Sequence, residues 1–277
     1  MESTKRYASV GSAIAVASLI AAIAAAELVP DPSWAWLWTA AALLAFCAGI
    51  GYGVSGHFNG LVIDNRNRVS LSKLQASAWS VLVLSAFLAA AIARIKLNLP
   101  NPIAVNIPQE LLAVMGISAT SLVATPIVLS LKSNEAAPPG QAQRTALMLG
   151  DDPNNVVPAG KVYARNSSGD AQWLDIFRGE EVSNAATPDL GKLQQFLITV
   201  VTLSIYSIQL WHLFGANQPT QAGTTFMETL PAFSANMAWL IGISHAGYLA
   251  YKAAPHDSGT APAGSSQTPA LQDNSVG

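Results

Sequence analysis

The chain has 277 residues, of which 51% are hydrophobic and only 11% are charged. A typical soluble domain is about 25% charged, so this composition argues against an ordinary soluble protein and favours a membrane protein. The net charge of −2 gives no basic character that would indicate nucleic-acid binding. The single cysteine, Cys47, excludes an intrachain disulfide and a thiolate metal cluster within one chain.

Six apolar stretches are each long enough to cross a hydrocarbon core of about 30 Å as a helix. They lack the alternating pattern of barrel strands, and helices satisfy every backbone polar group within the segment. The sequence therefore predicts an all-α integral membrane protein, built as a six-helix transmembrane bundle. The predicted spans are residues 8–26, 34–54, 76–95, 110–131, 193–214 and 232–251.

The positions of lysine and arginine predict the orientation of these spans. Twelve of the fourteen fall before span one, between spans two and three, between four and five, or after six. Only Arg94 and Lys96 fall on the other side. Because positive residues mark the cytoplasmic side, we expect a multi-pass protein of the cell's inner, bacterial-type membrane with both termini in the cytoplasm. Trp34, Trp36 and Trp38 fit an interfacial aromatic belt at the outer end of span two.

A competing interpretation concerns the first span. Lys5 and Arg6, an apolar stretch and the run from Ala24 to Ala26 resemble a signal peptide with its cleavage site. The apolar stretch is about nineteen residues, longer than the roughly 7–15 of such a segment, which favours a retained span. Cleavage would leave five spans, and the charge count of the remaining chain does not decide between the two.

The loop 132–189 is the only sizeable region outside the predicted spans. Its start, 134–143, is rich in proline, glycine and alanine and is typical of a linker. Residues 161–165 and 172–177 carry strand-forming residues on either side of a turn-like cluster at 166–170. This pattern predicts a small β-hairpin.

Two acidic pairs lie in the same loop, Asp151-Asp152 and Glu180-Glu181, and we expect both to be solvated. The tail from Pro255 onward is rich in serine, glycine, proline and glutamine. This composition favours disorder.

An internal repeat is the most informative feature of the sequence. When the chain is shifted by 119 residues, 58–87 lies over 177–206, and ten of the thirty columns are identical. Chance would give about two matches at ordinary composition. Gly116-Ile117-Ser118 in span four also matches Gly242-Ile243-Ser244 in span six. Each unit contributes two spans, which predicts two tandem, parallel two-helix repeats. The expected organisation is 1–54 as an N-terminal transmembrane hairpin, 55–131 as repeat 1, 132–176 as a cytoplasmic loop, 177–252 as repeat 2 and 253–277 as a tail.

The repeated motif begins with a capping residue. Ser70 and Asp189 share a column directly before a predicted helix, where each side chain can accept a bond from a free backbone N–H. A lysine follows in the first turn, where we expect it to snorkel toward anionic headgroups. The motif predicts either a capped helix start with an interfacial anchor or a symmetric cytoplasmic mouth for an anion or headgroup. The residues of that mouth are Lys73, Gln75, Lys192 and Gln194.

Span five carries a polar helical face, and span six carries a histidine, His245, near its middle. Polar groups in lipid are costly unless they have partners or face water. The face therefore predicts either a hydrogen-bonded seam between helices or the lining of a path, and His245 is either a packing residue or a relay. The residues of the face are Gln195, Thr199, Thr202, Tyr206 and Gln209.

Motifs for phosphate loops, dinucleotide binding, nucleophile elbows and zinc proteases are absent from the sequence. We therefore expect no enzyme, no cofactor and no metal. A small channel or transporter in the lipid bilayer is the favoured function. The alternative is a membrane-anchored sensor or scaffold that acts through the loop 132–189 on a cytoplasmic protein partner. The sequence leaves a homo-oligomer open.

Overall fold

The computed structural model describes residues 2–216 and 226–254, so the predicted disordered tail lies outside the described residues. Within these ranges, five helices are long and apolar enough to cross a membrane. They make the chain a mostly helical, multi-pass membrane protein, as the sequence predicts. The five are α1 (Glu2–Leu28), α2 (Pro32–Ser55), α3 (Leu71–Lys96), α4 (Gln109–Ser133) and α6 (Leu190–Ala216).

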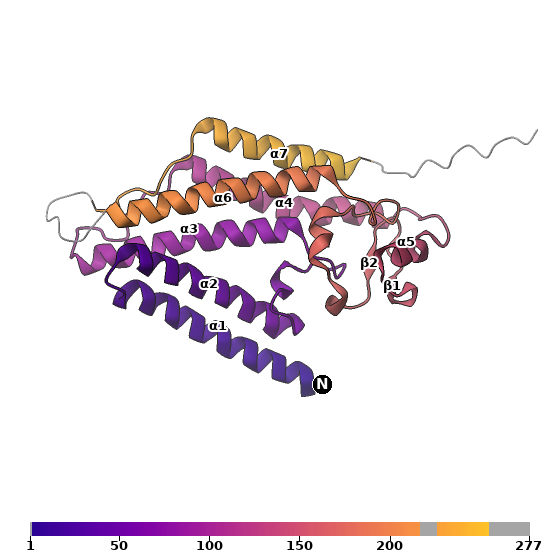
Figure 1. The fold of residues 1–277 in the computed structure, drawn as a ribbon, viewed down its shortest axis with the longest axis horizontal. Coiled ribbons are helices and arrows are strands. Elements are labelled where there is room, and N and C mark those ends of the chain that lie inside the picture. The colour runs from indigo at the N-terminus through magenta and orange to yellow at the C-terminus, as the bar shows by residue number, and fades with distance from the viewer. Residues whose placement is uncertain (1, 217–225, 255–277) are drawn as a thin grey trace, which may run out of the picture.

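The sixth predicted span forms α7 (Ala235–Ala253), which lies beside α4 and α6 (Figure 1). It is 19 residues long but is not among the helices that qualify as membrane spans. Asn236, His245 and Lys252 lower its hydropathy. The count of six spans therefore stays a prediction.

Helices α3, α4, α6 and α7 form one bundle. Helix α3 contacts α4, α6 contacts α7, α4 contacts α7, and α3 contacts α6. In each hairpin the first helix thus meets the first helix of the other, and the second meets the second. This is the arrangement expected of two parallel repeats about a twofold axis, although the duplication itself stays a prediction.

Helices α1 and α2 form a hairpin that packs against α3 and α6 and lies at an angle to the bundle (Figure 1). They pack through glycines: a Cβ added to Gly11 would lie 2.3 Å from the Cα of Gly53, and one added to Gly49 would lie 2.8 Å from Ile14. Such close backbone approach is typical of small-residue contacts between membrane helices. In the structure, α1 is therefore closely packed against α2, and its cleavage remains an untested alternative.

One of the three tryptophans expected at the interface is buried. Trp36 is 4% exposed, stacks on Phe214 with ring centroids 5.8 Å apart, and donates a hydrogen bond from Nε1 to Ser85 Oγ at 3.1 Å. The interfacial prediction is wrong for Trp36, because the indole N–H found a buried partner. Trp34 and Trp38 are exposed.

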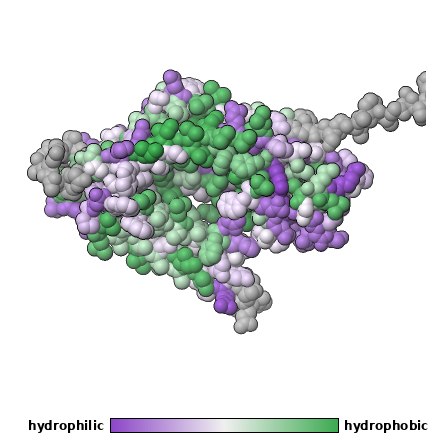
Figure 2. All heavy atoms as spheres, in the orientation of Figure 1, coloured by the Kyte–Doolittle hydropathy of each residue, from purple (hydrophilic) through white to green (hydrophobic). Residues whose placement is uncertain are grey.

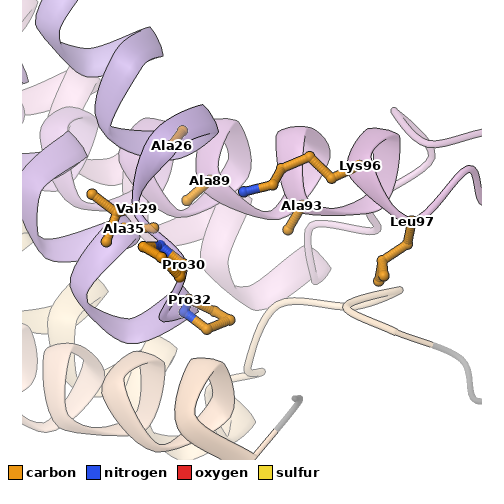
Figure 3. A pocket seen from close by; sticks show the side chains of 9 residues that line it. All are labelled: Ala26, Val29, Pro30, Pro32, Ala35, Ala89, Ala93, Lys96 and Leu97. Carbon is orange, nitrogen blue, oxygen red and sulfur yellow. The ribbon is translucent and has the colours of Figure 1, made fainter. Parts of the chain in front are cut away.

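A small cavity of about 50 Å³ lies between the α1–α2 turn and the end of α3 (Figure 3). Alanine and proline side chains line most of it, together with the stem of Lys96, whose Nζ donates to Glu27 O at 2.7 Å. An apolar cavity of this kind stays dry, so it is a packing defect and not a ligand site.

The segments 56–70 and 134–189 fold together over one end of the bundle, and we call them the cap. Hydrophilic residues gather over this end (Figure 2). The cap contains α5 (Gln141–Leu149) and an antiparallel pair of strands, β1 (Val156–Val157) and β2 (Ala164–Arg165). Its 3₁₀ helices are Gly60–Val62, Pro153–Asn155, Ser168–Asp170 and Trp173–Phe177.

Two details of the predicted loop are wrong. The hairpin exists, but the partner of β2 is 156–157 and not 172–177. Residues Trp173–Phe177 form a 3₁₀ helix, because Gln172 N donates to Asp175 Oδ2 at 2.9 Å in a capping box. The predicted linker 134–143 gives way to α5 from Gln141.

Candidate functional site

Glu180 is the centre of a buried charge cluster where the cap meets the helix ends. Its carboxylate forms ion pairs with Arg66, with Lys192 Nζ at 2.7 Å and with Lys252 Nζ at 2.9 Å. Burial alone would raise the pKa of Glu180, but Arg66 and the two lysines hold that pKa well below its ordinary value. The expectation that Glu180 is solvated is therefore wrong.

Asp175 is a second centre of the cluster. It accepts from Arg165 Nη1 at 2.7 Å and pairs with Arg68 Nη2 at 3.4 Å. Although burial opposes ionisation, the positive charges of Arg68 and Arg165 lower the pKa of Asp175. Its backbone oxygen also accepts from Lys192 Nζ at 3.3 Å, so the two centres share a lysine.

Glu181 extends the cluster to the remaining helix end. It is 3% exposed and pairs with Lys132 Nζ at 2.5 Å, so the expectation that Glu181 is solvated is also wrong. Lys132 Nζ also donates to Ala254 O at 2.6 Å. The cluster thus joins the end of α4, the start of α6, the end of α7 and the segment before α3. Breaking a buried ion pair leaves an uncompensated charge, so the cap is anchored to the bundle.

The structure confirms both predicted N-caps of the repeated motif. Ser70 Oγ accepts from Lys73 N at 3.4 Å, and Asp189 Oδ1 accepts from Lys192 N at 3.0 Å. The two lysines then diverge: Lys73 Nζ donates to Ile63 O at 2.7 Å, whereas Lys192 enters the charge cluster. The expected snorkelling of Lys192 to headgroups is wrong, because its side chain is buried and pairs with Glu180.

The two glutamines of the motif are also placed differently. Gln75 is buried, and Gln194 is exposed. Gln75 pairs instead with the neighbour of Gln194, because Gln195 Nε2 donates to Gln75 Oε1 at 3.1 Å. The structure therefore does not gather Lys73, Gln75, Lys192 and Gln194 into one symmetric mouth.

Buried polar side chains extend from the charge cluster into the bundle, and we call them the polar column. On every one of its four helices they recur at spacings of three or four residues, which places them on one helical face. The column consists of Ser72 and Gln75 on α3, Ser118, Ser121 and Thr125 on α4, Gln195, Thr199 and Thr202 on α6, and His245 and Tyr248 on α7.

Hydrogen bonds connect the column between α3 and α6. Gln75 Nε2 donates to Thr199 Oγ1 at 2.6 Å, next to its bond with Gln195. Thr202 Oγ1 donates back to Ile198 O at 2.8 Å within its own helix. Gln195 and Thr199 of the predicted polar face thus bond to α3, Thr202 and Tyr206 are buried, and Gln209 is exposed.

A second set of hydrogen bonds connects α4 with α7. Lys252 Nζ donates to the Tyr248 hydroxyl at 2.6 Å within α7, and Ser72 Oγ on α3 lies 3.1 Å from Thr125 Oγ1 on α4. One turn deeper, His245 Nδ1 and Ser121 Oγ are 2.6 Å apart. His245 is therefore a hydrogen-bonded member of the column, and it lies one helical turn from Tyr248 on α7.

An aromatic cluster closes the far end of the column. Tyr206 stacks on Phe233 with centroids 5.1 Å apart, and Trp79 lies edge-on to Phe233 at 5.7 Å. The Tyr206 hydroxyl donates to Pro231 O at 3.1 Å. Two column atoms, Gln195 Oε1 and Ser118 Oγ, are buried without a hydrogen-bond partner among the described residues.

Sequence reasoning missed most of the charge cluster. Arg66 and Lys252 entered the prediction only as markers of orientation, and Glu180 as a solvated pair member. A usable signal was present on α4, where Ser118, Ser121 and Thr125 repeat the spacing of the polar face of span five.

No protein-family model, curated protein or solved structure matches the chain. Among the described residues, no group of three histidine, cysteine or acidic side chains lies where it could hold a metal ion.

Proposed function

We propose that this chain is a small membrane channel or transporter, and that the polar column is its path. The observation that carries the proposal is the alignment of polar faces on four helices, all beginning at one charge cluster. Hydrogen-bonded pairs suffice to hold membrane helices together. In this column Gln195 Oε1 and Ser118 Oγ have no hydrogen-bond partner among the described residues. A continuous column with such free atoms fits a path for a polar solute better than it fits a seam that only holds the helices together.

The aromatic cluster of Trp79, Tyr206 and Phe233 is the gate in this proposal. It blocks the column in the present conformation, so transport requires these rings to separate. The cap side faces the cytoplasm in this view, because it carries most of the lysine and arginine residues. The bilayer surrounds the bundle, and association into a homo-oligomer remains open.

The test is ion flux into liposomes that contain the full-length protein. Protons are followed with an entrapped pH dye, and potassium with a membrane-potential dye. Thr202→Leu fills the column, and we expect it to lower the flux about tenfold or more, because a pore-lining donor is replaced by an apolar group. Ser204→Leu is the matched control, since Ser204 is exposed on the same helix.

The gate gives the experiment a second arm. Phe233→Ala removes one ring of the aromatic cluster, and we expect it to raise the flux above that of the unaltered protein. The proposal fails if neither the unaltered protein nor Phe233→Ala passes protons or potassium. The assignment of the path fails if Thr202→Leu and Ser204→Leu conduct equally.

A scaffold or sensor is the second candidate, and one feature of α5 favours it. Leu147 and Met148 are 66% and 76% exposed on the cap, away from the helix ends. Exposed apolar side chains of this kind mark contact sites when they adjoin one another. Deleting the loop would not test this candidate, because the deletion would also remove Glu180. The combined change Leu147→Ser and Met148→Ser leaves the charge cluster intact. Crosslinking in the membrane then compares the proteins captured by the unaltered chain and by this variant. Loss of every crosslinked protein in the variant would support the scaffold.

A further inference from the structure

The cap contains a polar pocket of about 350 Å³ that adjoins the charge cluster at Arg165 and shares no residue with the polar column. It lies between the turn that follows α5 and the segment that follows β2. A volume of this size is typical of a small-molecule site. Its lining residues are Gly150, Asp151, Asp152, Asn155, Arg165, Gly169, Asp170, Ala171 and Gln172.

Arg165 brings an unused donor to this pocket. The side chain is 1% exposed; its Nε donates to Asp151 Oδ2 and its Nη1 to Asp175 Oδ2, both at 2.7 Å. The remaining nitrogen, Nη2, is buried and has no hydrogen-bond partner among the described residues. A buried guanidinium N–H without a partner is costly, and Arg165 lines the pocket, so an acceptor atom that reached Nη2 would offset that cost.

The acidic residues of the pocket bring an unused acceptor. Asp170 Oδ2 is buried and has no partner among the described residues. Asp152 uses Oδ1 for the backbone N–H of Asn154 and is exposed to the pocket. The charge of Asp151 is balanced by Arg165, which leaves two carboxylates in excess. The pocket therefore favours a ligand with positive charge and disfavours an anion.

We infer that this pocket binds a small primary amine that also carries an oxygen acceptor, a class that includes the free α-amino acids, whose ammonium group balances their own carboxylate. The ligand oxygen accepts from Arg165 Nη2, and the ammonium group donates to Asp170 and Asp152. Such a ligand satisfies both orphaned atoms at once, whereas a simple amine or a simple acid satisfies one. The inference stands apart from the proposed transport path, because the site lies on the cap.

Calorimetric titration of the full-length protein in lipid nanodiscs tests the inference. The probes are the common α-amino acids, the N-acetylated form of each that binds, and methylamine. We expect saturable binding of at least one amino acid, and at least a tenfold loss of affinity on N-acetylation or with methylamine, since each removes one of the two interactions. Asp170→Asn should weaken binding to a similar extent.

Two further variants control for folding and position. Glu135→Gln removes an exposed carboxylate of the cap outside the pocket, and affinity should not change. Gly169→Ala adds a methyl group to a lining residue of the pocket; its Cβ would lie 3.4 Å from Ser167 Oγ and 3.6 Å from His57 Nε2, which the fold tolerates. We expect Gly169→Ala to weaken binding while the protein elutes as the unaltered one does.

The inference is overturned if no amino acid saturates the protein below about 10 mM. It is also overturned if N-acetylated probes bind equally well, or if Asp170→Asn and Glu135→Gln bind alike. An experimental structure with a single water bridging Arg165 Nη2 and Asp170 Oδ2 in the presence of saturating amino acid would overturn it too. None of these outcomes depends on whether the bundle conducts ions.

Discussion

Replacing Glu180 by glutamine should loosen the whole cap. The substitution keeps the shape of the side chain but leaves Arg66, Lys192 and Lys252 buried without their shared counter-charge. Removing one partner of a buried ion pair costs about 3–5 kcal/mol. Glu135→Gln is the matched control, because Glu135 is 55% exposed in its pair with Lys161 and such pairs contribute about 0–1 kcal/mol.

Hydrogen–deuterium exchange followed by mass spectrometry measures this loss of cap stability directly. The backbone N–H of Tyr163 donates to Glu180 O at 3.0 Å, and that of Val182 donates to Lys161 O at 2.8 Å. Both bonds lie within the cap and break when this part of the cap unfolds. A loss of about 3–5 kcal/mol corresponds to roughly 150- to 5,000-fold faster exchange at these amides. If Glu180→Gln accelerates their exchange no more than Glu135→Gln does, the charge cluster does not anchor the cap.

Three shorter predictions follow from the same geometry. The pKa of Glu180 is lower in the folded cap than in the unfolded chain. Its ionised form therefore stabilises the cap above the unfolded pKa, and this stabilisation is lost as the pH falls through the folded pKa. Cap amides should stay protected from exchange between pH 7 and about pH 5 and lose protection below about pH 4. Gly11→Ala forces α1 away from the backbone of α2 and should lower the free energy of unfolding by about 1–3 kcal/mol. The added Cβ of Gly116→Ala meets no atom within 4 Å, so this variant should not destabilise the fold. Thermal unfolding in detergent compares the two variants. Trp36→Phe loses the buried indole hydrogen bond and should cost about 1 kcal/mol more than Trp38→Phe in the same assay, and equal melting temperatures would contradict the buried position of Trp36.

The long helices were predictable because their signal is local. A run of apolar residues has few alternatives in a membrane, and caps such as Ser70 and Asp189 need only the next turn of helix. The polar face of α6 was predictable for the same reason, since spacing along one helix defines it. Its partner Gln75 was not, because hydrogen bonds between helices depend on packing that one sequence does not encode locally.

The charge cluster could not be predicted from the sequence, for a physical reason. Glu180 meets Arg66, Lys192 and Lys252, and only Lys192 lies within twelve residues of it along the chain. The orientation prediction assumes that each lysine side chain is solvated. A buried carboxylate nearby makes a buried lysine the expected result instead. The hairpin error has a similar origin: residues 172–177 have strand-forming side chains, but Asp175 is held by two arginines.

The pocket and the polar column are joined by a short chain of contacts, and this connects the two proposals. Arg165 shares the carboxylate of Asp175 with Arg68, and the backbone oxygen of Asp175 accepts from Lys192, which lies one turn before Gln195 on α6. A ligand that binds Arg165 Nη2 therefore acts two residues away from the column. If ligand binding changes the population of an open column by some factor, opening the column must change ligand affinity by the same factor. Phe233→Ala alters the gate without touching the pocket, so a shift in its affinity for the ligand would measure that coupling, and an unchanged affinity would mean that pocket and column work independently.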